Sequence, residues 1–112
     1  MRAKQITFNR PASFVENGVP LTPAQMAAAN YVVSVASNSG GTRDYTVPAA
    51  FIAGESGPVT VPFAALGFAP VPGVQYYVQV LVEVDGVQSS ASPAVTFTNS
   101  YTPAAPDSVS VS

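Results

Sequence analysis

Residues 72–86, PGVQYYVQVLVEVDG, contain the longest alternation of side-chain character in the chain, between a Pro-Gly and an Asp-Gly turn. One face would carry only aliphatic and aromatic side chains, namely Tyr76, Val78, Val80, Val82 and Val84. The other face would carry Tyr77, Gln79, Leu81, Glu83 and Asp85. Alternation of this kind, with β-branched and aromatic residues, is typical of a strand with one buried face. We therefore predict that this segment is the central strand of a β-sandwich.

The composition bounds both the size and the chemistry of the protein. Its 112 residues suffice for one domain that buries roughly two-thirds of its unfolded surface. The chain has no cysteine and no histidine, which excludes disulfides, thiolate metal sites and the usual general base near neutral pH. Only 9% of the residues are charged, whereas about 25% is typical of soluble domains. No cofactor is expected.

The distribution of charge and of apolar residues excludes two classes of partner. Three of the four basic residues (Arg2, Lys4 and Arg10) lie in the first ten positions. They form no basic stripe that would hold phosphates, so we expect no nucleic-acid binding. Polar residues interrupt the apolar residues near the N-terminus, and no apolar run approaches about 18 residues. We therefore expect neither a secretory signal nor membrane insertion.

Shorter segments with β-branched or aromatic residues predict the remaining strands. They are residues 5–9, 31–36, 43–47, 59–61 and 94–98, and residues 43–47 are expected at a sheet edge. Residues 49–58 are expected to be irregular, with Phe51 and Ile52 turned inward. Asp85-Gly86 favours a hairpin, but the segment that follows it, residues 88–93, predicts a connection longer than a tight turn. Several short strands separated by Gly, Pro and Asn indicate an all-β sandwich or barrel.

One short helix is expected near residues 23–29. Thr22 suits the N-cap, Pro23 suits the first helical position, and Asn30 suits the end of the helix. Two turns of alanine-rich helix would not be stable alone in water. We therefore expect Met26 to hold the helix against the body of the protein.

The inward faces of these strands together define an expected core. Its members are Ile6, Phe8, Tyr31, Val33, Val35, Val59, Val61, Leu66, Tyr76, Val78, Val80, Val82, Val95 and Phe97.

Residues 5–98 resemble a fibronectin type III-like domain. Residues 6–11 look like strand B of that family, with Phe8 where the family usually has tryptophan, and residues 72–80 look like the E–F corner and strand F. Ser92-Pro93 and residues 95–98 look like the F–G loop and strand G. The resemblance implies an immunoglobulin-like/fibronectin type III-like β-sandwich over residues 1–98, followed by an extended tail over residues 99–112.

The tail carries a second strand-like pattern. The family begins with strand A, for which the chain has almost no room before Ile6, whereas residues 103–111 look like the Pro-x-x-Pro lead-in and strand A of such a domain. Three alternatives are open: a free tail, completion of its own domain, and strand addition to a neighbouring copy. The candidate interface comprises Ile6, Phe8, Tyr101, Pro103, Pro106, Val109 and Val111.

The remaining candidates for chemistry are carboxylates and aromatic side chains. Glu83 and Asp85 would share one face of the long strand, and Glu16 would be needed with them to complete a calcium site. We interpret Glu83 and Asp85 as the solvated face of a strand, without catalytic or metal-binding roles. Aromatic residues with few charges nearby are typical of interfaces and sugar sites, so candidate surface contacts are Tyr45, Phe68 and Tyr77.

These observations predict a non-enzymatic structural protein. The resemblance implies a bacteriophage virion component, of the capsid-decoration or tail/fibre accessory class, which docks on the particle and stabilises it. Its partners would be viral capsid or tail proteins and other copies of itself, through the C-terminal strand, and it would be assembled into the virion in the bacterial cytoplasm. The alternative is a carbohydrate- or cell-surface-binding module of the adhesin type, with a host-surface glycan as its ligand.

Overall fold

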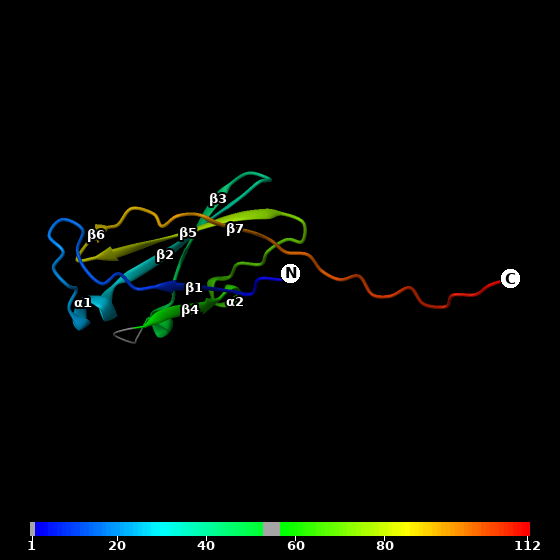
Figure 1. Cartoon of the computed structure of the whole chain (residues 1–112), viewed down its shortest axis with the longest axis horizontal. Coiled ribbons are helices and arrows are strands. Elements are labelled where there is room, and N and C mark those ends of the chain that lie inside the picture. Colours follow the sequence, from blue (N-terminus) through cyan, green and yellow to red (C-terminus); the bar gives the residue numbers. More distant parts are fainter. Residues whose placement is uncertain (1, 53–56) are drawn as a thin grey trace.

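The protein is all-β, as predicted. The computed structural model describes residues 2–52 and 57–112 (Figure 1). In these residues the strands are β1 Gln5–Asn9, β2 Asn30–Ser37, β3 Thr42–Thr46, β4 Pro58–Pro62, β5 Gln75–Val84, β6 Val87–Gln88 and β7 Val95–Thr98. The helices are α1 Pro23–Ala28, α2 Phe63–Leu66 and one 3-10 turn at Ala49–Phe51.

Strand β5 is the centre of the larger sheet, which confirms the prediction made from its alternation. It pairs along one edge with β2, placing Val33 opposite Val80 and Val35 opposite Val78. Along its other edge it pairs with β6 near its end and with β7 near its start. Strand β3 pairs with β2 and forms the outer edge of this sheet, as expected.

The smaller sheet contains β1 and β4. These strands are antiparallel, with Ile6 opposite Val61 and Phe8 opposite Val59. On the outer face the hydroxyls of Thr7 and Thr60 lie 2.9 Å apart in a cross-strand hydrogen bond. Residues directly opposite one another share a face, so the smaller sheet turns its valines and aromatic residues toward β5.

The core between the sheets follows the predicted list with one exception. Thirteen of its fourteen members are buried or pack against the buried cluster. Val95 does not: it lies opposite Val78 and faces inward, yet it is 66% exposed because none of the described residues covers it. The core also includes Leu21, Val47, Ile52, Phe63 and Phe68, which come from loops and short helices.

Local signals in the sequence predicted α1 well and missed α2. Thr22 caps α1 in a capping box with Gln25, and Met26 packs against the core. The helix is capped at its end by Ala29, and Asn30 instead begins β2. Helix α2 has only four residues, between Pro62 and Gly67, which ends it with a φ of 77°, and one turn is too short to show a periodic pattern.

The turn after β5 is tighter than predicted. Val84 pairs with Val87, so Asp85 and Gly86 alone make the connection. Both have positive φ, 53° and 79°, as a two-residue type I′ hairpin requires. Asp85 therefore lies in the turn and not on the face of the strand with Glu83.

The tail leaves the end of the body that also holds the N-terminus and extends away along the long axis (Figure 1). It accounts for the elongated dimensions, 76 × 28 × 20 Å. Asn99 still belongs to the body, because it is 2% exposed and its side chain bonds both the N–H and the C=O of Ala3. Residues 100–112 are exposed, and residues 108–112 form no strand within the single chain.

Candidate functional site

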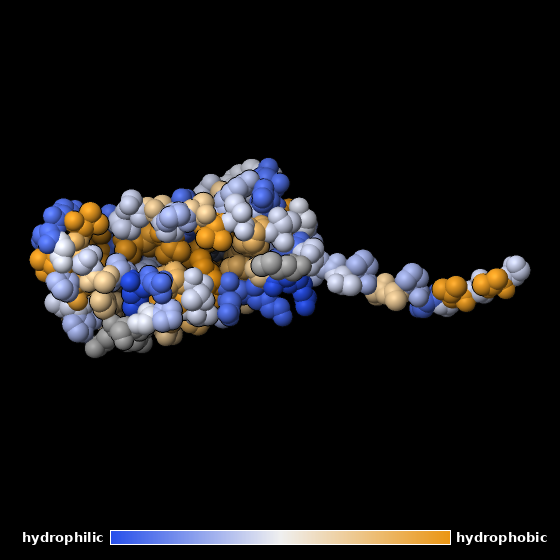
Figure 2. Space-filling view, in the orientation of Figure 1, coloured by the Kyte–Doolittle hydropathy of each residue, from blue (hydrophilic) through white to orange (hydrophobic). Residues whose placement is uncertain are grey.

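An apolar groove runs along the open side of the protein, between β1 and β7. Its main hollow has a volume of about 490 Å³. The lining residues come from both sheets and from the segment before β7: Ala3, Gln5, Ile6, Thr7, Phe8, Phe63, Val78, Val80, Ser92, Pro93, Val95, Thr96 and Phe97. Figure 2 shows hydrophobic atoms at the bottom of this hollow, in the middle of the face in view.

The groove continues past Phe8 toward the far end of the body. A second hollow of about 330 Å³ shares Phe8, Val80 and Ser92 with the first. A third, of about 160 Å³, lies beyond it and shares Val82 and Ser89 with the second. We refer to the three hollows together as the open groove.

One wall of the open groove is an irregular segment held on β5 by serines. The N–H groups of Val80 and Val82 donate to the Oγ atoms of Ser92 and Ser89, at 2.9 and 3.0 Å. The N–H groups of the same two serines donate back to the C=O groups of Val80 and Val82. These serines therefore replace a regular strand between β6 and β7.

The other wall is β1, whose outer edge has no partner strand in the described residues. The N–H of Phe63 donates to the C=O of Lys4 at 2.9 Å. In an antiparallel ladder, alternate residues bond the partner. The N–H and C=O groups of Gln5, Thr7 and Asn9 therefore point away from β4, toward the groove side.

Two other exposed sheet edges, those of β4 and β3, are protected against pairing. Pro58 and Pro62 of β4 lie opposite Asn9 and Gln5, at positions whose N–H groups would point to the outer edge of β4. Proline has no N–H, so this edge cannot form a full ladder. At the edge of the larger sheet, β3 carries exposed Arg43 and Asp44, and charges discourage edge pairing. Of β1, β3 and β4 in the described part of the chain, β1 alone combines free backbone groups at its edge with an apolar hollow.

A charged residue closes β1 at one end of the groove. The Arg10 guanidinium donates through Nη1 to the Ile52 carbonyl at 3.1 Å and through Nε to the Gly57 carbonyl at 3.2 Å. Beside it, the buried hydroxyl of Tyr31 has no hydrogen-bond partner among the described residues, although the Arg10 guanidinium lies close enough to interact with it. Burial raises the pKa of Tyr31, and the Arg10 charge offsets part of this rise.

The candidate interface residues lie in two separate places. Ile6 and Phe8 line the groove, and Phe8 packs on Tyr31 with 4.9 Å between ring centroids. The five tail residues are exposed. Tyr101 contacts the body, with its ring centroid 5.3 Å from the Arg2 guanidinium carbon. Val109 and Val111 are 81% and 96% exposed. The single chain does not bring the two groups together.

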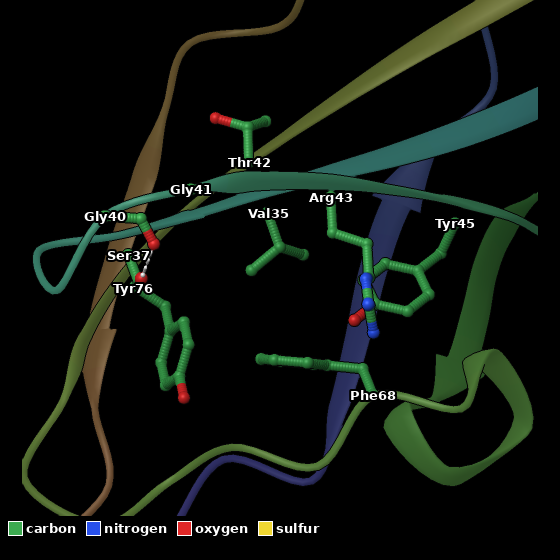
Figure 3. Close-up of a pocket in the computed structure, with 9 residues that line it drawn as sticks. All are labelled: Val35, Ser37, Gly40, Gly41, Thr42, Arg43, Tyr45, Phe68 and Tyr76. Carbon is green, nitrogen blue, oxygen red and sulfur yellow. Dashed lines mark hydrogen bonds between the residues drawn. The ribbon is translucent and has the colours of Figure 1, made fainter.

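The three aromatic surface candidates have different surroundings. Phe68 is 8% exposed and belongs to the core, so its assignment to the surface was wrong. It packs against Tyr45, and both line a pocket of about 320 Å³ with Arg43 at the β2–β3 hairpin (Figure 3). Tyr77 is 38% exposed on the outer face, and its hydroxyl donates to Gln75 at 2.9 Å.

The carboxylates do not gather into a site. Asp85 accepts a hydrogen bond of 2.8 Å from Gln25, which ties the hairpin turn to α1. Glu83 lies within β5, opposite Asn30 and Gln88. Over residues 2–52 and 57–112, no group of three or more acidic, histidine or cysteine side chains is placed to hold a metal ion.

Sequence patterns identified part of this site and missed the rest. They singled out Ile6, Phe8 and the tail, but not Arg10 or Pro93, and they placed Val95 in the core. The prolines that begin and end β4 were a usable signal, since they mark the edge that cannot be paired.

Comparison of the chain with protein-family models, with curated proteins and with solved structures finds no match in any of the three. None of the helices in the described part of the chain is long and apolar enough to cross a membrane.

Proposed function

We propose that this protein is a non-enzymatic structural component of a virus particle, of the capsid-decoration or tail/fibre accessory class. The observation that carries the proposal is the open groove, an apolar surface left uncovered beside an unpaired strand edge. Exposed apolar patches of this kind are typical of protein–protein contacts. A charged fraction of 9% also favours a protein that works within an assembly, because charge is depleted at interface cores.

The pairing of the strands is compatible with an immunoglobulin-like or fibronectin type III-like sandwich. The smaller sheet, β1–β4, corresponds to strands B and E of such a domain. The larger sheet, with β3, β2, β5 and β7 in order, corresponds to C′, C, F and G. In this assignment the place of strand A is the free edge of β1, and no strand of the described residues occupies it.

The virion assignment rests on the resemblance described above, and it is tested by locating the protein. Antibodies against the chain should label particles of the virus that encodes it at regular positions on the capsid or the tail, in negative-stain electron microscopy. Detection of the protein in infected cells but not in particles purified on a density gradient would contradict the proposal.

A carbohydrate- or cell-surface-binding module is the second candidate, favoured by the pocket at the β2–β3 hairpin. Arg43 and Tyr45 line it together with the buried rings of Phe68 and Tyr76 (Figure 3). An aromatic ring beside a guanidinium provides both stacking and hydrogen bonding to a sugar. Binding on a glycan array that Arg43→Ala abolishes, with Arg2→Ala as the control, would favour this function over the first.

A further inference from the structure

We propose that the open groove is occupied by the C-terminal tail of a second copy of this chain. Residues 108–112 of the donor copy would add as a strand to the free edge of β1, antiparallel to it. Val109 would lie opposite Phe8, and Val111 opposite Ile6. This inference rests on the proposed function as an assembly protein and names the partner of its groove.

The residue pattern of the tail matches that of β1 position by position. Strand β1 alternates polar and apolar residues over Gln5–Asn9, with Ile6 and Phe8 turned into the groove. Residues 108–112, Ser-Val-Ser-Val-Ser, alternate in the same phase. Residues directly opposite one another in a ladder lie on the same face, so both tail valines would enter the groove and the serines would face solvent.

The backbone groups of the tail segment fit the free edge once Ser108, whose φ is 54° in the single chain, becomes extended on pairing. The exposed groups of β1 belong to Gln5, Thr7 and Asn9, which lie opposite serines in this register. Each serine has the N–H that the ladder needs, and the tail prolines, Pro103 and Pro106, precede the paired segment. Three residues would thus bond by both N–H and C=O, as in recognised cases of strand addition to an open edge.

Charge supports the same register. One step before Ser108, Asp107 would lie opposite Arg10 on the inward-facing side. The guanidinium of Arg10 bonds only neutral carbonyls among the contacts described above, those of Ile52 and Gly57. A register shifted by two residues would keep the valines inward but would separate this carboxylate from the arginine.

The direction of the tail favours a second copy over the protein's own groove. Asn99 is bonded to Ala3, so the tail begins at the Gln5 end of β1. To pair antiparallel within one chain, it would have to run back along β1, about 17 Å at about 3.4 Å per residue, and then reverse. In Figure 1 it instead continues away from the body. A second copy in the same orientation beyond the tail would present the Asn9 end of its β1 first, as the register requires.

Such contacts are heterologous, because each copy donates a tail at one end and accepts one along its groove. They therefore build a head-to-tail chain of copies, unless the geometry closes a ring.

The first test is the mass of the full-length protein in solution. We expect light scattering to show concentration-dependent association of the wild-type chain. Val109→Asp combined with Val111→Asp should raise the dissociation constant at least about 100-fold, since each buried valine contributes a factor of about ten or more. Ala104→Asp with Ala105→Asp adds the same charge to the exposed spacer and should leave association unchanged. A wild-type chain that is monomeric throughout, or a valine variant that associates as well as the spacer variant, would overturn the proposal.

The second test is disulfide cross-linking, which the chain allows because it has no native cysteine. In this register Thr7 and Ser110 are directly opposite, at about 5.5 Å between Cα atoms, within the range for a disulfide. Thr7→Cys with Ser110→Cys should give, on mild oxidation, covalent products of two or more chains. Thr7→Cys with Val109→Cys places the thiols on opposite faces and should not.

The cross-linking result separates the occupants of the groove. A disulfide within one chain would show that the tail fills its own domain, and no cross-link would show that the tail does not bind β1; either result overturns the proposal. The proposed function fails on a different observation, namely absence of the protein from purified particles. If antibodies label the particles but the purified protein neither associates nor cross-links, the tail contact is refuted and the proposed function stands.

Discussion

Replacing Asn99 by alanine tests how the end of the sheet is joined to the start of the chain. The side chain is 2% exposed, its Oδ1 accepts from the N–H of Ala3 at 2.8 Å, and its Nδ2 donates to the Ala3 carbonyl at 3.2 Å. Each hydrogen bond is worth about 0.5–1.5 kcal/mol net, and a partner group left buried without a bond costs about 1–3 kcal/mol. Because Ala3 is only partly buried, water would reach some of the freed groups. We therefore expect Asn99→Ala to lower the free energy of unfolding by about 2–4 kcal/mol.

The assay is urea unfolding followed by far-ultraviolet circular dichroism, at a protein concentration where the wild type is monomeric. A loss of this size corresponds to a midpoint of thermal unfolding lower by roughly 10–25 °C. Asn17→Ala is the control, because Asn17 is exposed and its side chain accepts one local hydrogen bond, from Val19. We expect it to cost at most about 1 kcal/mol.

A conservative variant separates the two hydrogen bonds of Asn99. Asn99→Asp keeps the acceptor for the Ala3 N–H but replaces the donor with a second oxygen, which would face the Ala3 carbonyl. We expect it to be destabilising at neutral pH, because two acceptors would meet in a buried place. If Asn99→Ala lowers the free energy of unfolding no more than Asn17→Ala does, the hydrogen bonds of Asn99 to Ala3 do not stabilise the fold as the structure indicates.

Three further changes test the core and the helix. Tyr31→Phe should leave stability unchanged or raise it by about 1 kcal/mol, since the buried hydroxyl has no hydrogen-bond partner among the described residues; a loss above about 1 kcal/mol would contradict this. Burial raises the pKa of Tyr31 above its ordinary value of 10.0, and Arg10 offsets part of the rise. As the pH rises past 10, the folded state therefore keeps a proton that the unfolded state loses, and the free energy of unfolding should fall. Melts at several pH values should show that Tyr31→Phe removes this contribution to the fall. Phe8→Ala should cost about 2–4 kcal/mol in urea unfolding, because Phe8 is partly buried against Tyr31; a cost below about 1 kcal/mol would place it outside the core. Thr22→Ala should cost about 1 kcal/mol by removing the cap that bonds Gln25, and an unchanged melt would show that packing of Met26 alone holds α1.

Much of the fold could be predicted because its signals are local. A strand with one buried face needs alternating residues, and β1, β2 and β5 show that alternation directly. The start of α1 was equally readable, since Thr22 and Pro23 satisfy requirements of the first turn itself. The end of α1 was not, because Ala29 is not a distinctive capping residue, and helix α2 was not, because a single turn shows no periodic pattern.

Pairing and exposure depend on residues far apart in the sequence. Val95 has the pattern of a core residue and faces the same side as Val78, but the smaller sheet does not extend over it. Arg10 looks like one of several N-terminal bases until the fold places Ile52 and Gly57 around it. The turn at Asp85-Gly86 also needed the structure, because the pairing of Val84 with Val87 decides its length.

By itself the sequence determined which face of each main strand is apolar, where the helix begins, and that the tail repeats the alternation of a strand. Only the tertiary structure decided that the edge of β1 is open, that the edge of β4 is blocked by Pro58 and Pro62, and that the tail leaves the body at the Gln5 end of β1. The physical reason is that alternation is a property of one strand, whereas an unpaired edge and an uncovered groove are properties of neighbours that the chain brings together only on folding.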